Sequence, residues 1–160
     1  MLRIPLTHPE ILRALASAGH GARVLVADGN YPLSTASPLS ASRVYLNLRP
    51  GCLTVTEVLS TLATVLPIES ALCMQPPGDK TPTIFAEFID ILGAGVPIET
   101  QDRKSFYASA LSPSTCLAIA TGEQRRFANI LLTLGTVRLP ADVEFYESHS
   151  LDYATPLLRP

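Results

Sequence analysis

The sequence predicts an α/β fold: a layered sandwich in which a mostly parallel central sheet is flanked by helices. Short strand-like apolar segments alternate with segments whose apolar residues recur at helical spacing. Residues 116–121 (CLAIAT) form a nearly continuous apolar run, which is typical of a strand covered on both faces. With 160 residues, we expect one domain at 1–138 and a C-terminal tail at 139–160 that packs on the body or on a neighbouring subunit.

The first half of the chain contains signals for two helices and three strands. The expected elements are a helix at 8–18, strands at 23–27 and 43–48, a helix at 54–66 and a short buried strand at 68–74. Thr7 with Glu10 matches a capping box and predicts the first helix, which Gly19 ends. Thr54 with Glu57 repeats the capping-box pattern at the second helix.

The second half continues the alternation. The expected elements are a helix at 81–92, a strand at 96–100, a helix at 102–110 and strands at 116–121 and 129–134. Pro82 suits the first turn of the first of these helices, and Gly93 closes it. Asp102 is an expected N-cap of the second.

The composition limits the classes of partner. Hydrophobic residues make up 47% of the chain and charged residues 16%, so we expect part of the surface to be covered by other subunits. A net charge of -2 gives no electrostatic case for nucleic acid or for an anionic membrane surface. The doublet Arg125-Arg126 is explained by a solvated face. No apolar run approaches the roughly 20 residues of a membrane span, and we find no secretory signal.

Cysteine and histidine positions argue against disulfides and metal sites. The three cysteines form no C-x-x-C pair and are expected to be reduced, as in a cytoplasmic protein. The three histidines are far apart and show no metal-ligand spacing. Phosphate-binding, dinucleotide-binding, serine-hydrolase and zinc-protease motifs are absent. Cofactor-free acid/base chemistry is therefore the one enzymatic class that the composition supports.

Several polar residues lie near the ends of predicted strands, where α/β proteins build sites. His20 is a candidate general acid/base, or a cation at the C-terminus of the first helix. Asp28 either holds a ligand hydroxyl, orients His20 or satisfies turn amides. Glu69 lies in an apolar strand, where an unpaired carboxylate is costly, so it is either paired or part of a site.

Further candidates follow in the second half of the chain. Arg103 and Tyr107 are four residues apart and project from one helix face. Gly122, at a strand end, either brings backbone close to a ligand or makes a tight turn. Asn129, at a strand start, is most often a turn or cap residue.

Six groups of residues also carry a family resemblance. They are 19–21 (GHG) with 27–32 (ADGNYP), 66–69 (LPIE), 73–75 (CMQ), 103–107 (RKSFY), 120–123 (ATGE) and 127–132 (FANILL). On these segments, residues 1–137 resemble the L-fucose mutarotase and D-ribose pyranase family, and the fucose branch more closely. The resemblance implies an α/β sandwich assembled into rings, often decamers, with sites at subunit contacts. It also implies interconversion of sugar anomers or ring forms without a cofactor.

The resemblance assigns roles to individual residues. It implies that His20 is the proton donor or acceptor, and that Tyr107 and Glu69 bind substrate or assist proton transfer. An imidazole with an unperturbed pKa of about 6.5 can serve either role at neutral pH. Mutarotation removes one proton from the anomeric hydroxyl and delivers one to the ring oxygen.

Five further residues are expected to bind the sugar. The resemblance implies that Asp28 and Arg103 bind sugar hydroxyls and that Met74 lines the pocket. Phe127 and Asn129 are expected in the substrate-binding turn. No metal is expected.

The chain departs from the family pattern at four positions. Phe127 replaces the usual tyrosine, Ala128 a glycine, Ala22 an aspartate, and Glu69 a shorter aspartate. These changes indicate a shifted substrate preference or reduced activity. The leading hypothesis is thus a monosaccharide mutarotase of the fucose type. The alternative is a sugar-binding or ring-assembly protein that has lost efficient turnover.

Overall fold

The computed structural model describes residues 2–78 and 80–137. The C-terminal tail expected at 139–160 lies outside the described residues. In chain order the elements are α1 (Pro9–Ala16), β1 (Arg23–Ala27), β2 (Ser42–Tyr45), α2 (Val55–Ala63), β3 (Ile68–Met74), α3 (Ile84–Leu92), β4 (Ile98–Gln101), α4 (Arg103–Ala110), β5 (Thr115–Ala120) and β6 (Ile130–Leu134). The predicted alternation of helices and strands is confirmed.

The six strands form one mixed sheet in the order β2-β5-β1-β6-β3-β4. Strand β5 is parallel to both β2 and β1, and β3 is parallel to β4. Strand β6 is antiparallel to its neighbours β1 and β3, so that β1 and β3 point the same way. Parallel pairing therefore predominates, as the sequence predicts, with β6 as the exception.

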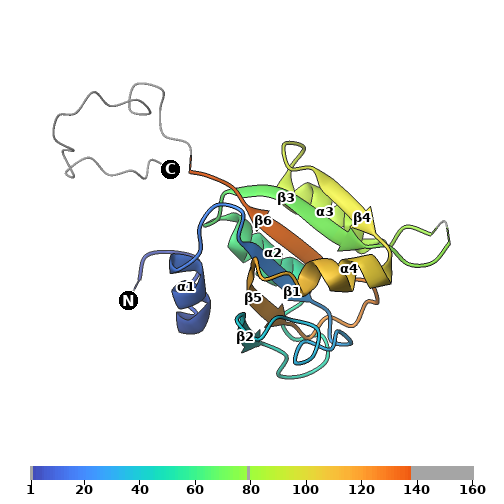
Figure 1. The fold of residues 1–160 in the computed structure, drawn as a ribbon, viewed down its shortest axis with the longest axis horizontal. Helices are drawn as coiled ribbons and strands as arrows, with labels where there is room; N and C mark the ends of the chain where they lie inside the picture. Colours follow the sequence, from blue (N-terminus) through green and yellow to red (C-terminus); the bar gives the residue numbers. More distant parts are fainter. Residues whose placement is uncertain (1, 79, 138–160) are drawn as a thin grey trace.

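Helices cover both faces of this sheet (Figure 1). On one face, buried side chains of α1, α2 and α3 pack with those of the central strands, including Val24, Leu117 and Ile130. On the other face, Phe106 of α4 and residues of the long connection after β1 pack on Leu25 and other strand residues. Central strands that are buried on both faces explain the continuous apolar run seen at β5.

The capping residues in the sequence predict some helix starts correctly and one incorrectly. Thr54 and Glu57 form the predicted capping box, and Asp102 caps α4. The first helix is different: His8, not Thr7, is its N-cap, because the imidazole Nδ1 accepts from the backbone N–H of Ile11. The strands predicted at 23–27 and 68–74 match β1 and β3 at both ends, and the other predicted boundaries lie within a few residues of the observed ones.

Two properties of the described part bear on function. No helix within residues 2–78 and 80–137 is long and apolar enough to cross a membrane. The same residues contain no group of three or more His, Cys, Asp or Glu side chains placed to hold a metal ion.

Candidate functional site

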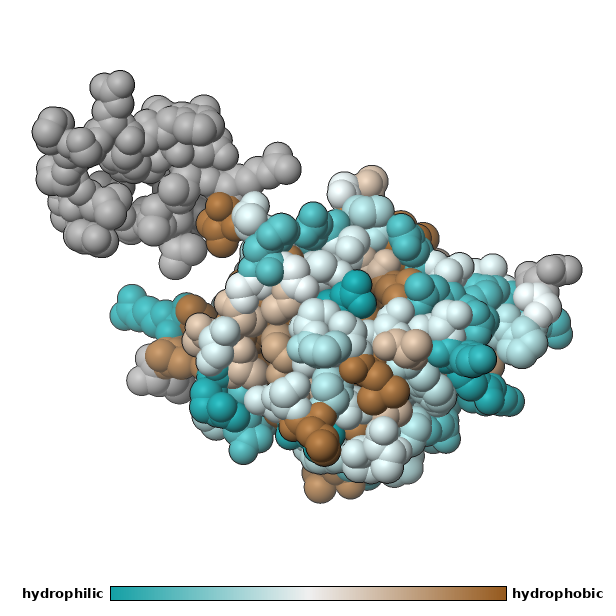
Figure 2. Space-filling model, viewed as in Figure 1, coloured by the Kyte–Doolittle hydropathy of each residue, from teal (hydrophilic) through white to brown (hydrophobic). Residues whose placement is uncertain are grey.

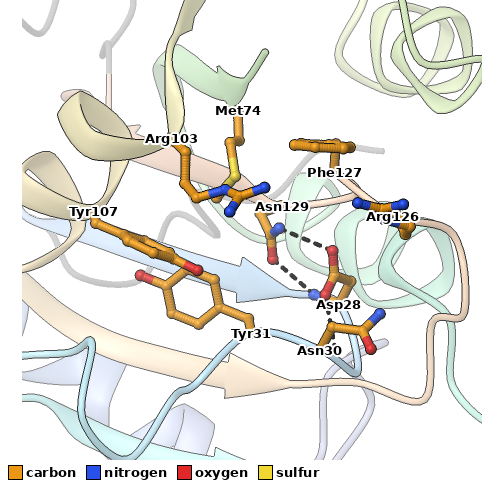
Figure 3. A pocket seen from close by; sticks show the side chains of 9 residues that line it. All are labelled: Asp28, Asn30, Tyr31, Met74, Arg103, Tyr107, Arg126, Phe127 and Asn129. Carbon is orange, nitrogen blue, oxygen red and sulfur yellow. Dashed lines mark hydrogen bonds between the residues drawn. The ribbon is translucent and has the colours of Figure 1, made fainter. Parts of the chain in front are cut away.

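A cavity of about 300 Å³ opens at the end of the sheet where β1 and β3 finish (Figure 3). Its lining combines hydrogen-bonding groups with three aromatic rings and a thioether close to the strand ends. The lining residues are Asp28, Asn30, Tyr31, Met74, Arg103, Tyr107, Arg126, Phe127 and Asn129. Such a mixture suits a small molecule that carries several hydroxyl groups.

Asp28 and Asn129 form the floor of the cavity through a reciprocal pair of hydrogen bonds. Asp28 follows β1 and Asn129 precedes β6, so the antiparallel pairing of these strands brings the two residues together. The Asn129 Oδ1 accepts from the Asp28 backbone N–H at 2.9 Å, and its Nδ2 donates to the Asp28 carboxylate at 2.9 Å. Both residues are buried. Asn129 thus binds Asp28 rather than only ending a turn.

The Asp28 carboxylate has two tasks in this arrangement. Its other oxygen accepts from the backbone N–H of Asn30 at 2.9 Å, which fixes the turn after β1. Burial raises the pKa of Asp28, and the hydrogen bonds from Asn30 and Asn129 oppose this rise. The turn-amide interpretation of Asp28 is therefore correct, and the same carboxylate also faces the cavity.

Helix α4 supplies the opposite wall. Arg103 and Tyr107 lie one turn apart and both line the cavity, as their spacing predicts. Buried Phe106 anchors the helix on the sheet. The Tyr107 ring meets Tyr31 edge-on, with centroids 5.1 Å apart, and burial raises the pKa of the Tyr31 phenol.

The turn before β6 forms the third wall. Phe127 has a φ of 63°, a left-handed backbone conformation that residues other than glycine seldom adopt. The guanidiniums of Arg103 and Arg126 lie 5.8 and 5.5 Å from the centroid of the Phe127 ring. Both distances are within the range of cation–π attraction.

An ion-pair network holds this turn on the body of the protein. Arg125 binds the buried Glu123 carboxylate through Nε at 3.0 Å and a terminal nitrogen at 2.8 Å, and also pairs with Glu87 of α3. These bonds to Arg125 lower the pKa of Glu123. Thr121 adds a hydroxyl bond to the Ala27 carbonyl at 2.8 Å.

Gly122 serves packing rather than ligand approach. A Cβ there would overlap the backbone carbonyls of Arg49 and Cys52, and the Gly122 N–H donates to the Leu53 carbonyl at 2.9 Å. Only glycine permits this contact between the loop after β5 and the segment before α2. The close approach predicted for Gly122 is thus to another part of the chain.

His20 and Glu69 lie together at the other end of the sheet. His20 precedes β1 and Glu69 is near the start of β3, and these strands point the same way. The His20 Nε2 lies 3.0 Å from a Glu69 carboxylate oxygen, with the side chains 59% and 53% exposed. Glu69 is therefore paired, as one interpretation proposed, but it is not buried as its apolar strand suggested.

Two roles that the sequence suggested for His20, a cation at the end of the first helix and a partner of Asp28, are not observed in this chain. Helix α1 ends with Ser17 as its C-cap, and His20 bonds to Glu69 instead of to the helix terminus. Asp28 does not orient His20, because the five residues of β1, roughly 16 Å of strand, separate them. The cavity collects Asp28, Met74, Arg103, Tyr107, Phe127 and Asn129, but neither His20 nor Glu69.

Sequence reasoning missed three lining residues. Asn30 and Tyr31 lie in the turn that Asp28 begins, so their place beside Asp28 was a usable signal. Arg126 was assigned with Arg125 to a solvated face, which is wrong for Arg125, whereas Arg126 is exposed as predicted but also borders the cavity. Arg125 is paired with Glu123 and Glu87, and Arg126 lines the cavity.

Comparison with known proteins agrees with this fold. The chain is 26% identical to the D-ribose pyranase of Symbiobacterium thermophilum, over 84% of this chain and 98% of the relative. It is 28% identical to the human fucose mutarotase, over 84% and 92% of the two chains. The fucose mutarotase of Streptococcus pneumoniae, solved in complex with L-fucose, superposes with a TM-score of 0.69 at 25% identity, covering 86% of this chain and all of that one.

These identities are too similar to separate the ribose branch from the fucose branch. The model of the RbsD / FucU transport protein family matches residues 1–137, the whole of the sheet and its helices. The chain therefore belongs to the RbsD / FucU family.

Proposed function

We propose that this protein is a monosaccharide mutarotase, an isomerase that interconverts the anomers of an L-fucose-like aldose without a cofactor. The observation that carries the proposal is the cavity in which Asp28, Asn129, Arg103 and Tyr107 converge. A carboxylate, an amide, a guanidinium and a phenol supply the donors and acceptors that a ring of hydroxyls requires. The relatives named as D-ribose pyranase and fucose mutarotase support the same reaction.

Each lining residue has a role in this proposal. Asp28 and Arg103 bind sugar hydroxyls, and Asn129 holds the Asp28 carboxylate in place. Phe127 and Met74 offer apolar surface to the face of the sugar. Tyr107 projects its hydroxyl into the cavity, where it binds the reacting end of the sugar or relays a proton.

We further propose that His20 of a second copy completes the site. The His20–Glu69 pair is exposed and lies at the end of the sheet opposite the cavity. A surface that presents an imidazole outward can reach the cavity of a neighbour, whereas it cannot reach its own. Glu69 then orients the His20 ring through the 3.0 Å contact.

Exposed apolar side chains support self-association into a ring-like homo-oligomer. Leu39 is 93% exposed and Leu48 85%, and Figure 2 shows apolar groups at several places on one face. The free cysteines Cys52, Cys73 and Cys116 agree with a cytoplasmic location.

The proposed chemistry is a pair of proton transfers. A base removes the proton of the anomeric hydroxyl while an acid protonates the ring oxygen, so the C1–O bond of the ring breaks and an aldehyde forms. Rotation of the carbonyl and reclosure give the other anomer. His20 and Tyr107 are the proposed acid/base groups, and positioned groups of this kind contribute roughly 10²- to 10⁴-fold.

Saturation-transfer NMR of the anomeric protons tests the proposal. We expect the purified protein to accelerate anomer exchange of L-fucose, D-ribose or a related aldose above the protein-free rate. Exchange at the protein-free rate for every sugar, together with sugar binding, would favour the binding-protein alternative.

A complementation experiment tests the shared site. His20→Ala and Tyr107→Phe are each expected to slow exchange severely. Coexpression of the two variants should restore activity, because some sites then combine an intact cavity with an intact His20 from another copy. If both groups act within one chain, the mixed preparation will show no more activity than the two variants measured separately.

A further inference from the structure

The cavity has an excess of positive charge that a neutral sugar leaves without a partner. Its lining contains two guanidiniums, Arg103 and Arg126, and one carboxylate, Asp28. That carboxylate already accepts from Asn30 and Asn129. Within residues 2–78 and 80–137, neither the Arg103 nor the Arg126 guanidinium forms a hydrogen bond or an ion pair with the protein.

The neighbouring arginine shows the contrast. Arg125 binds both oxygens of Glu123 and also Glu87, so its charge is compensated by the protein. Arg126 is the next residue, yet its guanidinium lies over the Phe127 ring at the cavity. The protein therefore neutralises one arginine of the doublet and leaves the other exposed at the edge of the cavity.

The two uncompensated guanidiniums each lie within cation–π range of one aromatic ring. Arg103 comes from α4 and Arg126 from the turn before β6, and both lie against the same Phe127 ring (Figure 3). The positive φ of Phe127, 63°, holds this turn in a strained conformation of a kind that clusters at ligand sites. Planar guanidiniums are suited to bidentate binding of a carboxylate or a phosphate.

We infer that the preferred substrate of this protein is an anionic aldose, a sugar that carries a carboxylate or a phosphate group, bound through Arg103 and Arg126. The inference rests on the proposed mutarotase activity, but it replaces the neutral L-fucose-like aldose with a charged one and assigns Arg103 to the anionic group instead of a hydroxyl. The anionic group lies beside Phe127, while the ring hydroxyls reach Asp28 and the anomeric end reaches Tyr107. Arg126 is then the residue that determines specificity for charge.

The test compares three sugars that share one ring: D-galactose, D-galacturonate and D-galactose 6-phosphate. Anomer exchange is measured for each as kcat/KM above its own protein-free rate, since anionic groups accelerate ring opening in water. We expect at least one anion to exceed D-galactose by about tenfold or more, the size of a charge-assisted contact. The preferred anion identifies a carboxylate or a phosphate as the recognised group. Added salt should lower this preference.

Two charge variants locate the effect. Arg126→Gln should reduce the ratio of anionic to neutral turnover by about tenfold. Lys104→Gln removes the same charge from an exposed residue of α4 that does not line the cavity, and it should leave the ratio unchanged.

The outcomes separate the two proposals. In one outcome, neutral aldoses, including L-fucose and D-ribose, are turned over as fast as both anions, with the ratio of anionic to neutral turnover unchanged in Arg126→Gln. In that case the protein is a mutarotase, but the inference of an anionic substrate is wrong. If no sugar of either kind exchanges faster than without protein, the mutarotase proposal fails and takes this inference with it.

Discussion

The polar groups at the two ends of β1 differ in their burial: those at one end are buried, and those at the other end are exposed. At the carboxyl end, Asp28 is 3% exposed and bonded to Asn30 and Asn129. At the other end, His20 and Glu69 are more than half exposed and bond to each other. The hydrogen bonds of Asp28 all form within one folded chain, whereas the His20–Glu69 pair projects from its surface. Changes at the cavity end should therefore affect both stability and activity, and changes at the His20 end mainly activity.

The largest expected effect is the loss of His20. His20→Ala should slow anomer exchange by about 10²- to 10⁴-fold, because it removes a proposed acid/base group. Its effect on the free energy of unfolding should stay within about 1 kcal/mol, since an exposed contact between a histidine and a carboxylate contributes little. Saturation-transfer NMR and urea unfolding measure the two quantities.

A second histidine provides the control for this prediction. His8→Asn removes another imidazole but keeps an N-cap acceptor for the Ile11 N–H, so activity and stability should both persist. Normal exchange in His20→Ala would remove His20 from the mechanism.

At the cavity end, Asn129→Leu should reduce stability and activity together. The substitution leaves the Asp28 N–H without an acceptor and the Asp28 carboxylate without the amide donor. Each buried group left unsatisfied costs about 1–3 kcal/mol. Asn47→Leu, the same change at an exposed residue, should have no comparable effect on the urea midpoint. Unchanged stability of Asn129→Leu would mean that the two ends of the sheet do not differ as described.

Arg125→Met should weaken the cavity wall in a pH-dependent way. The pKa of Glu123 is lowered from its ordinary value of 4.5 by Arg125, so its contribution to stability is present above about pH 4.5 and is lost as pH falls through the lower folded value. The variant removes the guanidinium from the buried Glu123 carboxylate and leaves it the backbone N–H of residue 125, at a cost of about 1–3 kcal/mol at pH 7. Urea unfolding between pH 3 and 7 should show the difference from wild type shrinking toward acid.

Glu87→Gln separates the two halves of this network. Glu87 is 45% exposed on the side chain, so its loss should cost less than the loss of Arg125. A constant difference between wild type and Arg125→Met at all pH values would contradict the role given to Glu123.

The sequence predicts this fold where the signals are local. The capping box of Thr54 and Glu57 and the N-cap Asp102 depend on neighbours within four residues, and both are observed. The antiparallel direction of β6 depends on pairing with distant strands, which no local pattern encodes. His8 caps α1 in place of Thr7 because the extended backbone residue before the helix is His8, and its imidazole accepts from the Ile11 N–H.

The residues of the candidate site likewise differ in whether local sequence signals could place them. The family resemblance identified six lining residues, but the sequence does not reveal which arginine of the 125–126 doublet meets Glu123. Arg125 is also held by Glu87 of α3, which is distant in sequence, and no local pattern encodes that contact. The separation of His20 from Asp28 follows from the strand predicted at 23–27, whereas the contact of His20 with Glu69 depends on the common direction of β1 and β3, which only the assembled sheet reveals.

The smallest expected effect, and the sharpest test of the comparison, comes from Glu69. Glu69→Gln keeps a hydrogen-bonding oxygen near His20 but removes the charge of the pair. Because both side chains are more than half exposed, the free energy of unfolding should change by less than about 1 kcal/mol. Turnover should fall by less than about tenfold, since His20 remains and only its orientation weakens. A large loss of stability would show that Glu69 supports the fold rather than the imidazole. A loss of turnover equal to that of His20→Ala would instead make Glu69 itself a group that contacts the sugar.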